Sequence, residues 1–204
     1  MWRHCFLGTT SGLLMLGIFG ILAPPDRLFR VSMAFAYTAL VMLAATMVVG
    51  PLNVLRSRPN PVSTYLRRDI GIWAGLLALG HVVFGLQVHL RGRMRLYFMY
   101  GADEPHLFPV RHDLFGLANY TGLAVTVALL LLLTLSNNAL LRKLGPRRWK
   151  RLQRWNYGAF ALIVVHGIAY QVIERREFLF VGFGFVIVLA VVSLQMAGLR
   201  RVIR

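Results

Sequence analysis

Six long apolar segments constrain the fold of this chain more than any other feature of its sequence. An α-helix needs about 20 predominantly apolar residues to cross a hydrocarbon core about 30 Å thick, and each segment approaches or reaches that length. The segments are Leu7–Leu22, Val31–Leu55, Ile70–Leu90, Leu114–Leu135, Tyr157–Ile173 and Phe178–Ala197. The sequence therefore predicts an all-α fold, a polytopic six-helix transmembrane bundle surrounded by the lipid bilayer.

The composition agrees with this prediction. Hydrophobic residues make up 57% of the chain and charged residues 15%, whereas soluble domains carry about 25% charged residues. We expect a single integral membrane domain over residues 1–204, with no room for a soluble nucleotide-binding domain. The single cysteine, Cys5, excludes an intramolecular disulfide and a cysteine-based metal cluster.

The net charge of +16 follows the positive-inside rule and does not indicate a nucleic-acid partner. With six spans, both termini and the second and fourth connections share one side. That side carries 15 of the 23 Lys and Arg residues but only one acidic residue, Asp69. Its basic residues are Arg3, Arg56, Arg58, Arg67, Arg68, Arg142, Lys143, Arg147, Arg148, Lys150, Arg151, Arg154, Arg200, Arg201 and Arg204. Both termini are therefore predicted to be cytoplasmic.

Two histidines lie in the middle of apolar segments, His81 in the third and His166 in the fifth. An ionisable residue at bilayer depth is expensive unless it has a partner, so such residues are candidates for function. The alternative is that each imidazole simply hydrogen-bonds to a neighbouring helix, as polar side chains in membrane helices often do.

The depths of the two histidines favour a shared ligand. His81 lies 13 residues after Arg68, and His166 lies 11 residues after Trp155. Both helices start on the cytoplasmic side in the predicted topology, so at about 1.5 Å per residue the imidazoles reach comparable depths. Matched depth is what the two axial ligands of one haem iron require. His89 would lie about 12 Å further out, where it either binds a second group or faces water.

Small residues near these histidines could let the helices pack around a haem, and basic residues could pair with its propionates. The five glycines that would let helices approach closely are Gly71, Gly75, Gly80, Gly158 and Gly167. The three arginines on the predicted outer side that could pair with haem propionates are Arg91, Arg93 and Arg111. Ordinary helix packing and solvation are the alternative explanations.

Three stretches of the sequence resemble the ferric-reductase-like transmembrane domain family. They are LRRDIGIWAGLLALGH, the glycine-containing start and LTLS end of the fourth segment, and LGPRRWKRLQRWNYGAFALIVVH, all within Pro51–Gln171. Bacterial members include the haem-binding membrane subunit of the periplasmic methionine-sulfoxide reductase system. The resemblance implies that His81 and His166 hold b-type haem. It also implies electron transfer from a flavin or quinone donor to an acceptor on the outer side.

The chain departs from this family at Gln153. Many members have a histidine 13 residues before the second ligand, where it helps to hold another haem or cofactor toward the cytoplasm. Glutamine is a poor haem ligand, so we expect one haem b per chain, in the outer half of the membrane. Membrane quinol or a neighbouring subunit then becomes a better electron donor than a soluble cytoplasmic flavoprotein.

The sequence leaves three functions to compare. The leading prediction is an electron-transfer subunit in the bacterial inner membrane, which acts as an oxidoreductase subunit with other proteins or an outside redox partner. The alternative is a structural or accessory subunit of a larger membrane complex with little or no redox role, which Gln153 favours. A transporter is disfavoured because the apolar segments contain almost no carboxylates or helix breaks.

Overall fold

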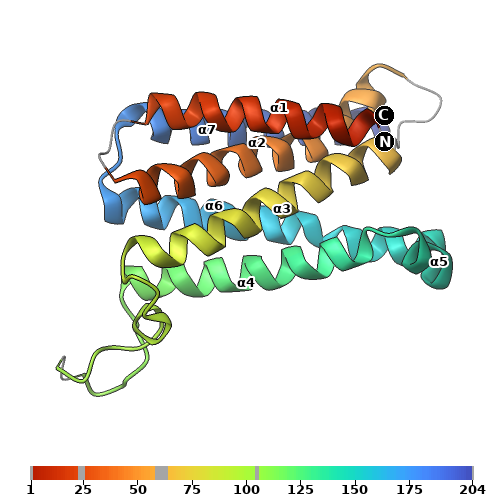
Figure 1. The fold of residues 1–204 in the computed structure, drawn as a ribbon. Helices are drawn as coiled ribbons and strands as arrows, with labels where there is room; N and C mark the ends of the chain where they lie inside the picture. Colours follow the sequence, from red (N-terminus) through yellow and green to blue (C-terminus); the bar gives the residue numbers. More distant parts are fainter. Residues whose placement is uncertain (1, 23–25, 58–63, 104–105, 204) are drawn as a thin grey trace. The chain divides into compact units, whose positions relative to one another are not determined.

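The computed structural model describes residues 2–22, 26–57, 64–103 and 106–203. These residues form helices and no strands, as the sequence predicted. In chain order the helices are α1 (Trp2–Ile21), α2 (Arg27–Leu55), α3 (Thr64–Val88), the short 3₁₀ helix η1 (Met94–Tyr97), α4 (Leu114–Leu135), α5 (Asn138–Gln153), α6 (Trp155–Glu174) and α7 (Phe178–Ile203) (Figure 1). Arg58 and Arg204, which the topology prediction counts, lie outside the described residues.

Six helical segments among the described residues are long and apolar enough to cross a membrane, which confirms the predicted number. Helix α4 begins and ends at the predicted residues. Helix α1 begins earlier than predicted, at Trp2, and α7 continues to Ile203. The extensions include Arg3 in α1 and Arg200 and Arg201 in α7. Arginine is a good helix former, so the helices continue beyond their apolar segments.

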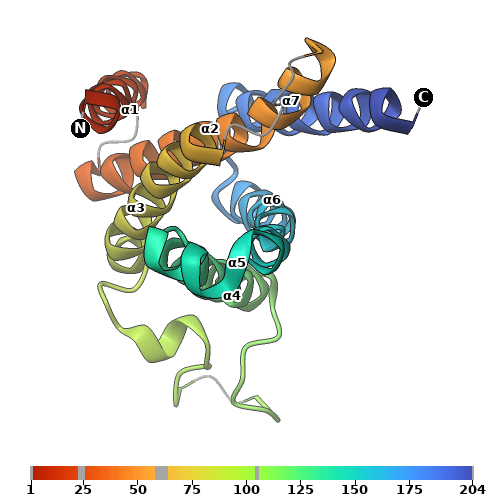
Figure 2. The ribbon, with the colours of Figure 1, turned by 90° about the vertical axis from the view of Figure 1, so that its right-hand side faces the viewer.

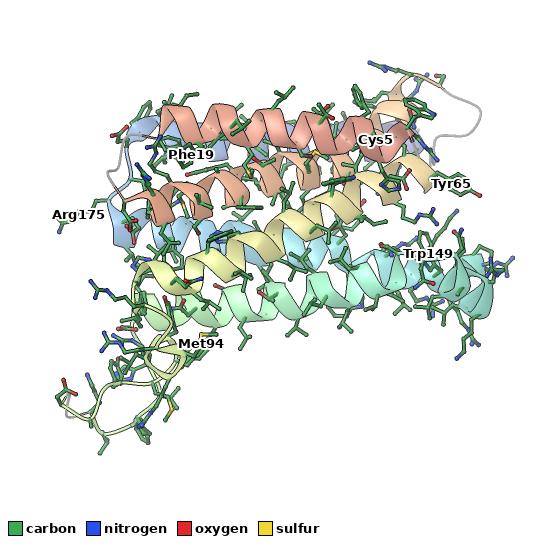
Figure 3. The ribbon with its side chains drawn as sticks, in the orientation of Figure 1. Cys5, Phe19, Tyr65, Met94, Trp149 and Arg175 are labelled. Carbon is green, nitrogen blue, oxygen red and sulfur yellow. The ribbon has the colours of Figure 1, made fainter. Side chains whose placement is uncertain are left out.

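The fourth connection, which carries many of the basic residues, forms a helix, α5, that the sequence did not predict. Asn137 caps α5, and its side-chain oxygen accepts a hydrogen bond from the Leu140 amide at 2.8 Å. The helix bends at Gly145, whose φ of 73° lies in the left-handed region, just before Pro146. Trp149 is buried and donates its indole N–H to the Leu135 carbonyl at 2.8 Å, which ties α5 to the end of α4 (Figure 3).

The chain divides into two compact units. The first holds residues up to His81 together with α7. In it α2 packs against α1 and α7, and Cys5 and Phe19 mark the two ends of α1 (Figures 1 and 3). Tyr37 is buried, and its ring centroid lies 5.5 Å from that of Phe180. A Cβ on Gly198 would lie 3.0 Å from the Pro51 Cβ, so this glycine permits the close approach of α7 to α2.

The second unit runs from Val82 to Glu177. Its helices α4, α5 and α6 pack together, and the connection from α3 to α4 projects away from them (Figure 2). Tyr97 anchors this connection: its ring is 1% exposed, and its hydroxyl donates to the Leu86 carbonyl at 2.7 Å. Asp113 caps α4 by accepting a hydrogen bond from the Gly116 amide at 2.7 Å.

Candidate functional site

His81 is held by the backbone of α2 within the first unit. Its Nδ1 lies 3.0 Å from the carbonyl oxygen of Ser32 and 3.0 Å from the Ser32 hydroxyl. A carbonyl oxygen only accepts, so a hydrogen bond to it requires the ring proton on Nδ1, and the Ser32 hydroxyl can then accept as well. In that tautomer of neutral imidazole the lone pair is on Nε2. Ser32 is 0% exposed, so this hydrogen bond is shielded from water.

Gly80 explains how α3 comes so close to α2. A Cβ at this position would lie 2.6 Å from the Phe35 ring, a distance that real Cβ atoms do not adopt. Of the glycines singled out from the sequence, Gly71 makes only an ordinary contact, and Gly167 has open space around it. Gly80 therefore has the packing role that the sequence suggested for the whole group.

His166 is held in the same way within the second unit. Its Nδ1 lies 2.8 Å from the carbonyl oxygen of Ala118 on α4, which again assigns the proton to Nδ1 and the lone pair to Nε2. A Cβ on Gly122 would lie 2.9 Å from both Nδ1 and Cε1 of the ring. The imidazole therefore packs directly on the α4 backbone, at a position where only glycine leaves room.

The two histidines fit the chemistry of haem ligation. Histidines that bind metals typically donate their other ring N–H to a carboxylate, a backbone carbonyl or water, which orients the ring and increases its basicity. His81 and His166 each have such a carbonyl, within their own unit. The described residues contain no group of three or more His, Cys, Asp or Glu side chains suited to a metal ion bound by protein alone. Two imidazoles suffice for haem, because the porphyrin supplies the other four ligands.

Tyr170 lies against His166 and is hydrogen-bonded to Asn119, and neither residue was predicted from the sequence. The Tyr170 hydroxyl donates to the Asn119 side-chain oxygen at 2.9 Å. Its ring centroid lies 5.0 Å from that of His166, at an interplanar angle of 59°. Polar residues inside apolar segments are the signal that would have pointed to them, together with the spacing of one helical turn between His166 and Tyr170.

His89 is placed just beyond the end of α3, against α6. Its Nε2–H donates to the Glu174 carboxylate at 3.1 Å, and its ring stacks on Tyr170 with centroids 5.6 Å apart. Burial lowers the pKa of His89 from its ordinary value; Glu174 opposes this change and Arg176 adds to it. The structure therefore gives His89 a carboxylate partner within the second unit.

Arg111 is engaged in the connection before α4. Its guanidinium lies 3.0 Å from the Asp113 carboxylate and also donates to the Leu96 carbonyl at 3.3 Å. Burial tends to raise the pKa of Asp113, but hydrogen bonds from Arg111 and the Gly116 amide outweigh it and hold the pKa below its ordinary value. Arg91 and Arg93 are exposed. Arg111 thus fastens this connection, whereas the other two face away from the packed core.

The remaining sequence candidates have partners or surroundings of their own. Gln153 ends α5, and its Nε2 is buried without a hydrogen-bond partner among the described residues. His4 lies 3.7 Å from the buried carboxylate of Asp69 in the first unit. His106 stacks on Tyr100 in the connection before α4.

No protein-family model matches the sequence, and a comparison with curated proteins returned no match. What the chain does is therefore inferred from its residues and their geometry.

Proposed function

We propose that this chain is a multi-pass membrane electron-transfer subunit that binds one b-type haem through His81 and His166. One observation carries the proposal: each imidazole donates its Nδ1–H to a backbone carbonyl of a neighbouring helix, at 3.0 Å for His81 and 2.8 Å for His166. This assigns a lone pair to Nε2 in both rings, which is the state that an iron ligand needs. Haem, when bound, supplies one-electron redox chemistry.

The residues around each histidine support this role. The carbonyls of Ser32 and Ala118 orient the two rings and make them more basic, which favours the higher oxidation state of a bound iron. The apolar helices exclude water and lower the local dielectric, which is a further control on redox potential. The resemblance to ferric-reductase-like domains supports the same assignment.

The direction of electron transfer is proposed from the resemblance, and the proposed topology assigns a side of the membrane to the donor and the acceptor. Both termini lie in the cytoplasm because 15 of the 23 basic residues fall on that side, and the protein resides in a bacterial inner membrane. Gln153 provides no imidazole for a second haem toward the cytoplasm. Electrons therefore come from membrane quinol or a neighbouring subunit, and a flavin is the alternative donor. They leave to a redox partner on the outer side.

An absorption spectrum tests the proposed ligands. The full chain, purified from haem-replete cells, should show a low-spin b-type haem spectrum at one haem per polypeptide. His81→Ala and His166→Ala should each abolish that spectrum or make it high-spin, because each removes one axial ligand. His106→Ala, in the connection before α4, is the matched control and should leave the spectrum unchanged. A folded wild-type protein without haem would contradict the proposal.

A structural or accessory subunit without a redox role is the second candidate. Gln153 favours it, because its Nε2 is buried without a hydrogen-bond partner among the described residues, at a position where many members of the family that the sequence resembles have a cofactor ligand. The same spectrum separates the two candidates. An accessory subunit would fold and join its complex without haem, and His81→Ala and His166→Ala would change its stability alone.

A further inference from the structure

Two neighbouring residues of α4 hold two residues of α6 that lie one helical turn apart. His166 and Tyr170 are four residues apart and so share a face of α6. The Ala118 carbonyl accepts from His166 Nδ1 at 2.8 Å, and the Asn119 side chain accepts from the Tyr170 hydroxyl at 2.9 Å. Two hydrogen bonds therefore join neighbouring positions of α4 to one face of α6.

The side chain of Asn119, which accepts from Tyr170, has a fixed orientation. Asn119 is 9% exposed, and its Nδ2 donates to the Phe115 carbonyl of its own helix at 2.8 Å. That hydrogen bond assigns the amide nitrogen to Phe115 and the amide oxygen to Tyr170. The Tyr170 hydroxyl is therefore a donor with a defined partner, and its ring cannot turn away without breaking a buried hydrogen bond.

The His166 imidazole is confined by this arrangement. The Tyr170 ring contacts it with centroids 5.0 Å apart, and Gly122 of α4 also lies against it. The hydrogen bond from Nδ1 to Ala118 orients the ring, but one hydrogen bond tolerates a range of angles and the torsion about the Cβ–Cγ bond is broad. Tyr170 restricts that remaining rotation.

We propose that Tyr170, anchored by Asn119, is a positioning residue that fixes the plane of the His166 imidazole and thereby tunes a haem bound there. The proposal rests on the proposed function. It adds a residue that neither ligates the iron nor contacts it. The electron paramagnetic resonance spectrum of a low-spin bis-imidazole haem depends on the angle between the two imidazole planes, so ring rotation has a direct readout.

The experiment uses the full chain with haem bound. Tyr170→Phe removes only the hydroxyl. Asn119→Leu removes the acceptor of that hydroxyl together with the Nδ2 hydrogen bond to the Phe115 carbonyl. Both variants should keep one low-spin haem per chain, shift the largest g value in the same direction and change the midpoint potential. The g value of the double variant should shift no further than that of the more affected single variant, because both substitutions break the same hydrogen bond between Tyr170 and Asn119. Tyr120→Phe is the matched control, since its hydroxyl donates instead to the Phe98 carbonyl at 2.6 Å.

A conservative variant separates positioning from general stability. Asn119→Asp keeps a side-chain oxygen that can accept from Tyr170, so its g values should return toward those of the wild type. Wild-type g values in Tyr170→Phe, or equal shifts in Asn119→Asp and Asn119→Leu, would overturn the proposal. A Tyr120→Phe shift as large as that of Tyr170→Phe would also overturn it. A wild-type chain without haem would instead refute the proposed function, and this inference with it.

Discussion

The two candidate ligands could be predicted from single residues, but their immediate surroundings could not. His81 and His166 are identifiable because an imidazole is unusual inside an apolar segment. Their partners Ser32 and Ala118 act through backbone carbonyls, which every residue type carries. The Ser32 hydroxyl, also 3.0 Å from His81 Nδ1, is a side-chain signal for one of these contacts, but the carbonyls themselves leave none in the sequence. These contacts depend on which helices pair, and helix pairing is set by packing between distant parts of the chain.

Substitution of Gly122 tests whether the position of the His166 ring on α4 is needed for haem binding. Gly122→Ala would place a Cβ 2.9 Å from the His166 ring, so the imidazole must shift and the Nδ1 hydrogen bond to Ala118 must weaken. We expect loss of most of the bound haem, or a high-spin spectrum, and destabilisation of about 1–3 kcal/mol as for overpacked cores. Haem content and thermal unfolding are the measurements. Gly167→Ala is the control, because a Cβ there meets nothing within 4 Å; an equal effect of both substitutions would contradict the prediction.

At the scale of elements, the sequence predicted the apolar helices better than the polar one. The bounds of α4 were predictable because its apolar run starts after Asp113, a good helix cap, and ends at a polar pair. Helix α5 was missed because its sequence, NALLRKLGPRRWKRLQ, has too few apolar residues for a span and contains a Gly-Pro break. Its many basic residues are good helix formers, and Trp149 supplies the tertiary contact that a search for long apolar runs does not detect.

The burial of His89 against α6 makes the folding stability of this region sensitive to pH. Burial holds the pKa of His89 below its ordinary value of 6.5, so the unfolded chain binds this proton more readily than the folded chain. The stabilisation is therefore present above about pH 6.5 and is lost as the pH falls through the lowered pKa of the folded state. Thermal unfolding in detergent should show a lower Tm at pH 5 than at pH 7.5. His89→Gln should reduce that difference, whereas a loss of Tm on acidification as large as in wild type would contradict the prediction.

At the scale of the whole molecule, the division of basic residues predicts a definite topology. With an even number of spans, fusions of a reporter to the N- and C-termini should both report the cytoplasm. A reporter inserted beside Phe108, which is exposed in the long connection before α4, should report the outer side. Alkaline phosphatase and green fluorescent protein fusions give opposite signals in the two compartments and serve as mutual controls. Termini on opposite sides would show that one of the six segments does not cross the membrane.

Holding both imidazoles through main-chain oxygens has a consequence for how this protein tolerates sequence change. A side-chain partner disappears with one substitution, but the carbonyls of Ser32 and Ala118 remain whatever residue replaces them, provided that it fits. The vulnerable quantity is instead the register between paired helices, because a slip of one residue would carry the oxygen away from Nδ1. Because both positions are fully buried, substitutions by other small residues at 32 and 118 should therefore be more readily accepted than insertions or deletions within α2 or α4.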